Sequence, residues 1–253
     1  MKRTIIYTLL LLFSIATTSA QPSSSERWDA GNKAYMAGAY NQATEEYHAI
    51  LDGGEYSLEL YYNLANAYFK SDSLGKAILY YNKALRIDPS HEDALYNLAI
   101  AEARTKDKIT EVPEFFLNGW MRSMRDTLSC NTWSVLSILF FAIFLGGVLL
   151  FLLASAIRLR KVGFYGALSA LIIFVVATSF AVSSRNNMLS HDEAIVTASA
   201  IAVKSSPDHS STDLFVLHEG TKVRVVSEME NWAEVVIADG KKGWTEKRNF
   251  EKI

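Results

Sequence analysis

Two long uninterrupted apolar runs dominate the hydropathy pattern of the 253-residue chain. The first covers about 133–157, the second covers about 164–182, and neither contains a charged residue. As helices, both are long enough to cross the roughly 30 Å of hydrocarbon in a bilayer. The pattern therefore predicts transmembrane helix 1 over 133–157 and transmembrane helix 2 over 164–182, joined by a short loop over 158–163.

Three basic residues lie in the short connection between the two runs. Arg158, Arg160 and Lys161 fall within the predicted loop. Short loops rich in Lys and Arg stay in the cytoplasm. We therefore expect a hairpin whose turn is cytoplasmic and whose two outer ends lie on the opposite side of the membrane. Neither run holds Asp, Glu, Lys, Arg or His, which argues against a transporter or pump.

The first twenty residues have the features of a secretory signal peptide. Lys2 and Arg3 precede a mainly apolar stretch over 5–15, and small residues lead to a predicted cleavage point before Gln21. A signal peptide over 1–20 exports the chain that follows it. Whether or not it is cleaved, this orientation agrees with the one that the positive loop predicts.

A 34-residue period runs through the segment between the signal and the first apolar run. Three units share one register, over about 26–57, 58–91 and 92–107, and the third contains only its first helix. Small residues let two helices approach, and large residues fill the space between them, so such units must stack to bury their apolar faces. The recurring pairs include Ala43 with Ala77, Tyr47 with Tyr81, and Leu64 with Leu98.

The second unit resembles the tetratricopeptide (TPR) family closely. Pro89 ends its second helix, because proline cannot continue a helix. The resemblance implies an all-α TPR domain over 26–107, built of helical hairpins whose first helices line a protein-binding groove. Its signature positions hold Tyr61, Leu64, Ala65, Tyr68, Ala77, Tyr81, Ala84 and Pro89. The groove residues that the resemblance implies are Asn32, Asn63, Asn66, Lys70 and Arg104.

Some TPR domains hold the carboxylate at the end of a peptide with Lys and Asn side chains. Asn32, Asn63 and Arg104 match that arrangement. Trp28 and Ile100 stand where lysines are expected, so the clamp is incomplete. The alternative is that these asparagines belong to the family consensus and hold no carboxylate.

Residues 113–129 form an amphipathic pattern just before the first apolar run. Phe116, Trp120, Met124 and Leu128 recur every four positions, which places them on one face of a helix. The pattern predicts an amphipathic helix lying in the membrane interface. A helix packed against the last repeat unit is the alternative.

After Val182 the pattern changes to short alternating runs that are typical of strands. Asp239-Gly240 is a strong hairpin signal, and Gly243-Trp244 opens a further strand after it. Five short strands within about 60 residues predict a small all-β barrel. The other predicted strands lie within 195–203, 214–217, 221–226 and 232–237.

This tail resembles the bacterial SH3 family. The resemblance implies an SH3-like domain over 191–253, of a kind associated with contacts to cell wall or protein. Trp232 is the candidate ligand-binding residue of its groove, with core packing as the alternative, and we expect Trp244 in the core. The side chains with which eukaryotic SH3 domains bind proline-rich ligands are not evident. The matching stretches are 203–207, 214–226, 231–244 and 250–253.

The sequence offers little that could support catalysis. The five histidines lack metal-ligand spacing, and a His191-Asp192-Glu193 cluster is at most a weak metal site. No nucleophile motif or phosphate-binding loop occurs, and Cys130 is the single cysteine. A net charge of −2 gives no basic footprint for nucleic acid. We expect a protein that is not an enzyme, with no catalytic residue, cofactor or metal.

The order of the predicted parts is signal, TPR domain, membrane hairpin and SH3-like domain. This order resembles the Bacteroides aerotolerance (Bat) group of proteins. The resemblance implies a multidomain bacterial inner-membrane protein whose TPR and SH3-like domains are periplasmic, acting as a scaffold linked to aerotolerance or envelope stress. The implied partners are a MoxR-type ATPase and Bat proteins with von Willebrand A domains. The alternative is a peptidoglycan-binding sensor or an accessory to a cell-wall enzyme.

Overall fold

The computed structural model describes residues 22–110, 115–190 and 192–253. The predicted signal peptide over 1–20 lies outside these described residues. The chain divides into two compact units, with the division after Glu55.

The first unit is a helical hairpin of α2 (Ser24–Met36) and α3 (Tyr40–Asp52). Helix α2 begins with a reciprocal cap, in which the Ser23 N–H donates to Glu26 Oε2 at 2.8 Å and the Glu26 N–H donates to Ser23 Oγ at 3.3 Å. The two helices approach closely at Gly31, where a Cβ atom would lie 2.6 Å from the ring of Tyr47. Glycine at this position is therefore required by packing.

The second unit opens with α4 (Leu58–Lys70), α5 (Leu74–Ile87) and α6 (Glu92–Ala103). Ser57 caps α4 by accepting the Leu60 N–H at 3.1 Å, and Pro89 follows the end of α5. Helices α4 and α5 form the predicted second repeat, and α6 is the single helix of the third. Buried apolar residues of these helices include Leu60, Leu64, Ala65, Ala77, Tyr81, Ala84, Ala94 and Leu98.

Helix α7 (Phe116–Arg125) lies within the range predicted for an amphipathic helix, of which residues 113–114 fall outside the described chain. A short segment, from the C-cap Asp126 to the N-cap Ser129, separates α7 from α8. The indole Nε1–H of Trp133 on α8 donates to the Arg125 carbonyl at 2.8 Å, which ties the end of α7 to the start of α8.

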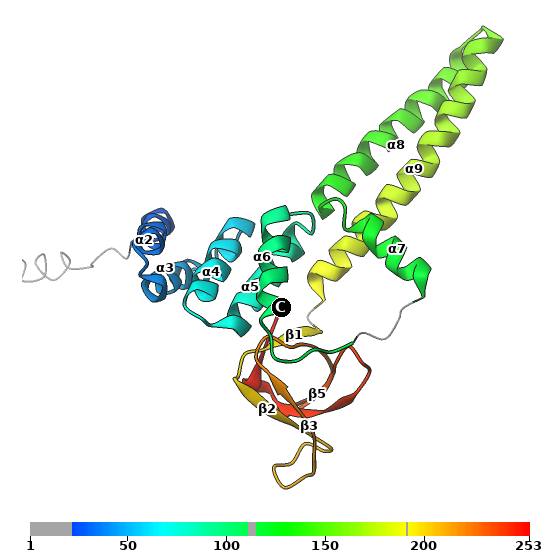
Figure 1. Ribbon diagram of the computed structural model, residues 1–253. Helices are drawn as coiled ribbons and strands as arrows, with labels where there is room; N and C mark the ends of the chain where they lie inside the picture. Colours follow the sequence, from blue (N-terminus) through cyan, green and yellow to red (C-terminus); the bar gives the residue numbers. More distant parts are fainter. Residues whose placement is uncertain (1–21, 111–114, 191) are drawn as a thin grey trace, which may run out of the picture. The chain divides into compact units, whose positions relative to one another are not determined.

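Helices α8 (Cys130–Leu153) and α9 (Ile157–Leu189) lie side by side as a hairpin (Figure 1). Both are long and apolar enough to cross a membrane. The prediction of a loop over 158–163 was wrong, because Arg158, Arg160 and Lys161 form the first turns of α9 and the connection is only 154–156. Arg and Lys favour helices, so the charges limit the apolar run without ending the helix.

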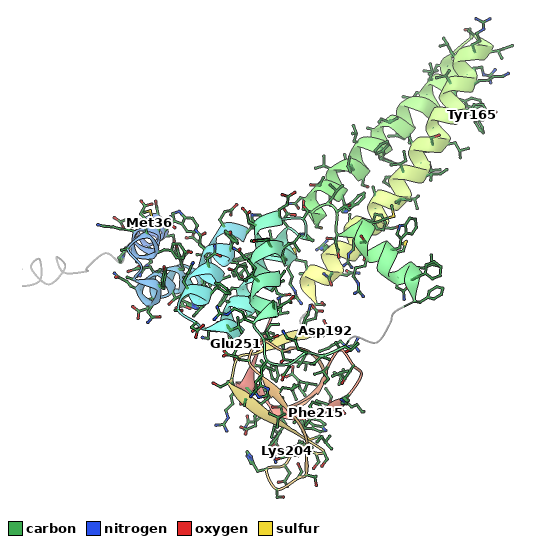
Figure 2. The ribbon with its side chains drawn as sticks, in the orientation of Figure 1. Met36, Tyr165, Asp192, Lys204, Phe215 and Glu251 are labelled. Atoms are coloured by element: carbon green, nitrogen blue, oxygen red, sulfur yellow. The ribbon has the colours of Figure 1, made fainter. Side chains whose placement is uncertain are left out.

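The hairpin is held together by small residues and one polar pair. A Cβ atom on Gly163 would lie 2.6 Å from the backbone nitrogen of Phe151 and 2.8 Å from the Gly147 carbonyl. Nearer the other end, the Ser137 and Thr178 hydroxyls are hydrogen-bonded at 2.7 Å. By contrast, Tyr165 points away from the hairpin with 64% of its surface exposed (Figure 2). Large apolar side chains therefore cover the outside of the hairpin.

The C-terminal part forms one antiparallel sheet, ordered β3-β2-β6-β5-β4-β1-β7. Seven strands are present among the described residues, whereas five were predicted. The predicted run over 195–203 is split by a bend after Val196, because its first part pairs with β4 and β7 and its second part pairs with β3 and β6. The strands are β1 (Glu193–Val196), β2 (Ala200–Lys204), β3 (Asp213–His218), β4 (Lys222–Met229), β5 (Trp232–Val236), β6 (Lys242–Glu246) and β7 (Phe250–Lys252).

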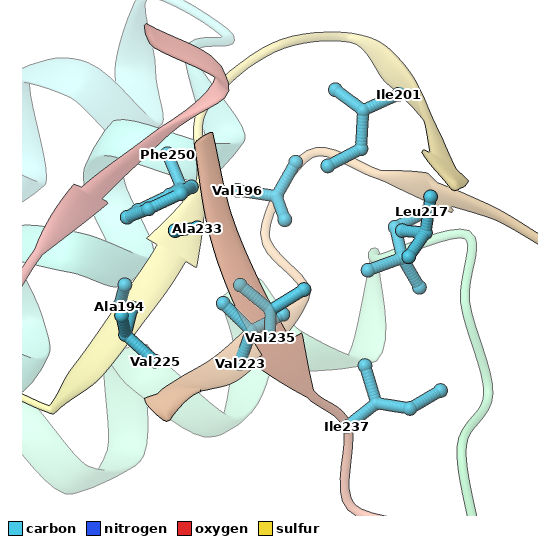
Figure 3. Close-up of a cluster of buried hydrophobic side chains, with 11 residues drawn as sticks. Ala194, Val196, Ile201, Leu217, Val223, Val225, Ala233, Val235, Ile237 and Phe250 are labelled. Carbon is cyan, nitrogen blue, oxygen red and sulfur yellow. The ribbon is translucent and has the colours of Figure 1, made fainter. Parts of the chain in front are cut away.

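The sheet encloses a single apolar core (Figure 3). Strict alternation in β5 turns Ala233 and Val235 inward, and both side chains are fully buried. Ile109, from the segment after α6, packs against the same core. The core residues are Ala194, Val196, Ile201, Val203, Leu217, Val223, Val225, Ala233, Val235, Ile237 and Phe250.

Within the second unit, α5 contacts the sheet directly. The Arg86 guanidinium donates to the carbonyl oxygens of Ser190 at 2.5 Å and Ile253 at 2.8 Å. The Gly75 N–H donates to Glu219 at 3.3 Å. These bonds join α5 to the end of α9, to the residue after β7 and to the β3–β4 turn, all more than one hundred positions later in the chain.

The segment after α6 adds a second set of bonds to the sheet. Asp107 accepts the backbone N–H of His218 at 2.7 Å and the hydroxyl of Thr221 at 2.6 Å. Burial alone would raise the pKa of Asp107, but these hydrogen bonds outweigh it and hold the pKa below its usual value. The carboxylate is therefore stabilised in its charged form.

The close approach of α8 and α9 gives a direct test. Gly163→Ala should loosen the hairpin, because the added Cβ meets backbone atoms that cannot rotate away, and overpacking of this kind costs about 1–3 kcal/mol. Hydrogen exchange of α8 and α9 peptides from the full chain in detergent micelles should become faster.

Gly166→Ala is the matched control, because a Cβ atom there meets nothing within 4 Å. Alanine also favours a helix by about 1 kcal/mol over glycine, so exchange should stay the same or slow down. Equal exchange in the two variants would contradict the packing described for Gly163.

Candidate protein-binding surfaces

In the first unit, the predicted groove residue Asn32 has an internal partner. The buried Tyr47 hydroxyl donates to Asn32 Oδ1 at 2.7 Å. Burial, and then the neighbouring Tyr35, raise the pKa of Tyr47 to about 12. The hydroxyl therefore keeps its proton, and with it the bond that joins α2 to α3.

In the second unit, Asn66 makes the same bond one period later. The Tyr81 hydroxyl donates to Asn66 Oδ1 at 2.6 Å, and Asn97 Nδ2 donates to the same oxygen at 3.0 Å. Asn97 also donates to the Tyr62 hydroxyl at 3.1 Å, so α4, α5 and α6 are joined by one polar network. The side-chain oxygen of Asn66 therefore accepts hydrogen bonds within the repeat. Its amide nitrogen is the group that could contact a ligand.

The other predicted groove residues are divided between α4 and the end of α6. Asn63, Asn66 and Lys70 share one face of α4, at the spacing that aligns side chains along a helix. Arg104, at the C-cap of α6, pairs with Asp72 at 2.6 Å and lies over the Phe69 ring. The structure therefore brings together the three α4 residues, whereas Arg104 contacts Asp72 in the α4–α5 turn.

On the sheet, Trp232 lies at the start of β5 on the outer face. Its cross-strand partner is Glu246, and the ring of His209 meets it edge-on at 5.1 Å between centroids. Trp232 is half-buried, so one part of its ring packs and another part is accessible. His209 was not identified from the sequence, because 23 positions separate it from Trp232 and only the fold joins them.

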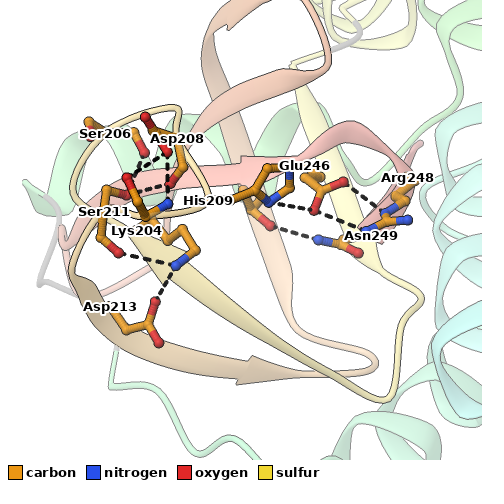
Figure 4. Close-up of polar contacts among 11 residues, drawn as sticks. Lys204, Ser206, Asp208, His209, Ser211, Asp213, Glu246, Arg248 and Asn249 are labelled. Atoms are coloured by element: carbon orange, nitrogen blue, oxygen red, sulfur yellow. Dashed lines mark hydrogen bonds and ion pairs between the residues drawn. The ribbon is translucent and has the colours of Figure 1, made fainter.

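The loop that carries His209 is held in a fixed form by its own polar contacts (Figure 4). Lys204 Nζ donates to the Ser211 carbonyl at 3.1 Å and pairs with Asp213 at 2.7 Å. Asp208 accepts the backbone N–H of Ser210 at 2.7 Å. His209 is therefore presented from an ordered loop between β2 and β3.

The acidic residue beside Trp232 is also fixed. Glu246 pairs with Arg248 at 2.8 Å, and one of its oxygens lies 3.8 Å from His209 Nδ1. The result is a surface of one indole ring, one imidazole, one carboxylate and one guanidinium. We call this set, Trp232, His209, Glu246 and Arg248, the Trp232 surface.

The expectation that Trp244 lies in the core was wrong. In β6 the inward positions belong to Gly243 and Thr245, so Trp244 is half-buried on the outer face, across from Glu234. Gly243 is needed because a Cβ atom there would lie 2.7 Å from the Lys204 carbonyl. Trp244 and Trp232 consequently share one face of the β5–β6 pair, as diagonal neighbours.

No group of three His, Cys, Asp or Glu side chains is placed to hold a metal ion in the described chain, and His191 of the weak cluster falls outside it. A shallow groove on α9 is lined by residues such as Phe174, Thr178 and Asn186, and it contains none of the predicted site residues.

Comparison with known families identifies two modules in the chain. Residues 58–91 match the tetratricopeptide repeat family, and residues 199–251 match the bacterial SH3 domain family. A comparison with curated proteins found no match. The two modules indicate protein–protein interaction or a peptidoglycan-binding adaptor role.

The buried Tyr47 hydroxyl makes stability depend on alkaline pH. Its pKa is about 12 in the folded chain and about 10 when unfolded, so its contribution is complete below pH 10 and is lost as pH rises through 12. We expect the denaturant midpoint of the full chain, followed by far-UV circular dichroism in detergent, to fall between pH 8 and pH 11.

Tyr47→Phe should make this fall smaller, while costing about 1 kcal/mol at pH 8 for the lost bond to Asn32. Tyr56→Phe is the control, because that side chain is 64% exposed. If Tyr47→Phe shows the same alkaline loss as the parent chain, the buried hydroxyl does not have the role assigned to it.

Proposed function

We propose that this protein is a membrane-anchored adaptor that holds partner proteins outside the cytoplasm. The observation that carries the proposal is the combination of two binding modules with a hairpin of two bilayer-length helices in one chain. One module precedes the hairpin and the other follows it. A hairpin that crosses the membrane twice therefore leaves both modules on the same side.

The exposure of α8 and α9 supports membrane insertion. Only 6% of the most apolar window of α8 and 28% of that of α9 are buried within the chain, whereas a core helix of a soluble protein would be mostly buried. At 1.5 Å per residue, α8 spans about 36 Å and α9 about 50 Å. Both lengths exceed the roughly 30 Å of bilayer hydrocarbon.

Basic residues support the orientation. Arg158, Arg160 and Lys161 lie in the first turns of α9, next to the connection over 154–156. This end of the hairpin is the only one with a cluster of three basic residues in the described parts of α8 and α9. By the positive-inside rule it faces the cytoplasm, and both modules then face the periplasm of a bacterial cell.

Helix α7 fits a position in the membrane interface. Phe116, Trp120 and Met124 share one face, and all three are exposed. Arg122 lies on the opposite side of the helix, where it would meet water and lipid headgroups. Because the Trp133 indole ties α7 to the first turns of α8, the helix lies where the predicted span enters the bilayer.

The more specific proposal is that the chain is BatE-like and works beside a MoxR-type ATPase and Bat proteins with von Willebrand A domains. It is supported by the order of the parts, with a TPR module, a two-helix hairpin and an SH3 module in one chain. In this proposal the α4 face with Asn63, Asn66 and Lys70 binds one partner, and the Trp232 surface binds another.

A peptidoglycan-binding adaptor is the second candidate. The observation that favours it is the placement of Trp232 and Trp244 on one outer face of the sheet. Two accessible indole rings, with Glu246 and Arg248 beside them, would suit a ligand that combines flat sugar faces with polar groups. Binding of purified peptidoglycan decides between the two candidates.

Replacement of Trp232 tests the role of the sheet. Trp232→Ala should lower at least tenfold the amount of partner protein recovered with the full chain from solubilised membranes, because the indole is the central apolar group of the surface. Val216→Ala, at a 53%-exposed residue of β3, should leave recovery unchanged.

The same two variants should be sedimented with purified peptidoglycan. If Trp232→Ala loses sedimentation but keeps its protein partners, the wall-binding candidate replaces the protein-binding one. If neither property changes, the Trp232 surface is not the ligand site.

Labelling of single cysteines tests the orientation. Cys130 is the only cysteine, so Cys130→Ser gives a background into which Ser155→Cys, at the turn between α8 and α9, and Ser206→Cys, in the β2–β3 loop, can each be introduced. A membrane-impermeant maleimide applied to spheroplasts should label position 206 at once and position 155 only after permeabilisation. The reverse pattern, or equal labelling, would contradict the proposed topology.

A further inference from the structure

Helix α6 ends the repeat array with an uncovered apolar face. Leu95, Tyr96 and Ile100 are exposed to 46%, 69% and 39%, and Ala99 between them is also exposed. On a helical wheel these residues and Ala103 form one continuous stripe. A helix that simply closes an array would carry polar residues here, so α6 does not serve only as a cap.

The preceding repeat shows what covers the equivalent face. Tyr61, Ala65 and Tyr68 of α4 stand 34 positions before Leu95, Ala99 and Glu102. In that repeat α5 covers the stripe, with Tyr80 contacting Tyr61 at 6.0 Å and Tyr68 at 5.6 Å between ring centroids.

Equivalent positions of α4 and α6 differ in burial. Ala65 is fully buried, whereas its equivalent Ala99 is exposed. Leu64 and Leu98, which are also 34 positions apart, are buried in both repeats. The part of the exposed face at Leu95 and Ala99 therefore corresponds to the surface that α5 covers in the preceding repeat. The equivalents of Tyr96 and Ile100 are Tyr62 and Asn66, which contact α5 through Tyr81 and also contact Asn97 of α6.

The charges at the edges of the stripe define the chemistry of a partner. Asp93 lies along one edge and Glu102 along the other, and Glu92 stands at its N-terminal end; all three are exposed. A helix that covers the stripe would gain from Lys or Arg on both sides of its apolar face. It would also need a small residue opposite Ala99, as α5 has Ala77.

We propose that α6 binds an amphipathic helix of a partner protein, which completes the third repeat as its second helix. The partner helix has an apolar face flanked by basic residues, and it packs against Leu95, Tyr96, Ala99 and Ile100. This inference rests on the proposed adaptor role and adds to it a binding surface and the kind of segment that it accepts. It is independent of the α4 face and of the Trp232 surface.

Site-specific photocrosslinking tests the proposal in the full chain. Tyr96 is replaced by p-benzoylphenylalanine, a larger aromatic residue that this exposed position can accommodate, and the protein is crosslinked in membranes of the cells that encode it. Tyr56 replaced in the same way is the control, since it is exposed to a similar extent, 64%, but lies before α4. Mass spectrometry identifies the crosslinked peptide.

The expected result is a crosslink from position 96, and not from position 56, to a segment of another protein with an apolar helical face and flanking Lys or Arg. Adding Ala99→Glu should lower its yield at least tenfold, because the new carboxylate stands in the centre of the stripe. A crosslink to a second copy of this chain, to lipid only, or to no protein would overturn the proposal.

These outcomes also separate this inference from the adaptor role. If partners are still recovered with the intact chain and are lost with Trp232→Ala, while position 96 gives no crosslink, the adaptor role stands and the α6 surface fails. If no partner is recovered and no crosslink forms, both proposals fail.

Discussion

Close packing on two sides of α5 is the constraint on which the second unit depends. On one side its aromatic and small residues fill the face of α4, where Tyr80 meets Tyr61 and Tyr68. On the other side a Cβ atom on Gly75 would lie 2.8 Å from the Val196 carbonyl of β1, so only glycine permits this approach. Every residue from Ala77 to Tyr81 is consequently buried, whereas an amphipathic surface helix would have exposed residues between the buried ones.

This packing decides which surfaces remain for partners. The side of α5 that could have faced solvent is used by β1 and by the Arg86 bonds to Ser190 and Ile253. Among the described residues of the second unit, the candidate binding surfaces are the α4 face with Asn63, Asn66 and Lys70, the α6 stripe and the Trp232 surface. Each of these has a different composition, with amide and amine groups on α4, apolar and acidic groups on α6, and aromatic and charged groups on the sheet.

The sequence was most informative where a periodic pattern reports on a local structure. The 34-residue register predicted the helices around Ala43, Ala77 and Leu98, and the apolar runs predicted the pair of long helices. The basic residues within 158–163 led to the wrong prediction of a loop. Hydropathy shows only which stretch suits lipid, whereas α9 continues as a helix beyond that stretch.

The candidate sites were less predictable because they depend on distant contacts. Trp244 was expected in the core, since a tryptophan among alternating residues fits either face until the register with β2 and β5 is known. The contact of His209 with Trp232 joins a loop to a strand, and no sequence spacing predicts it. Asn66 was correctly placed on α4, yet its bond to Tyr81 could be recognised only when the helices were seen together.

The most direct measurement asks whether α5 holds helices α4–α6 and the sheet in one fixed arrangement. Spin labels are attached through Glu59→Cys on α4 and Ser206→Cys in the β2–β3 loop of a Cys130→Ser chain in lipid nanodiscs, and their separation is measured by double electron–electron resonance. We expect one narrow distance distribution, which Gly75→Leu broadens by forcing α5 away from Val196. A broad distribution in the chain that retains Gly75 would contradict it.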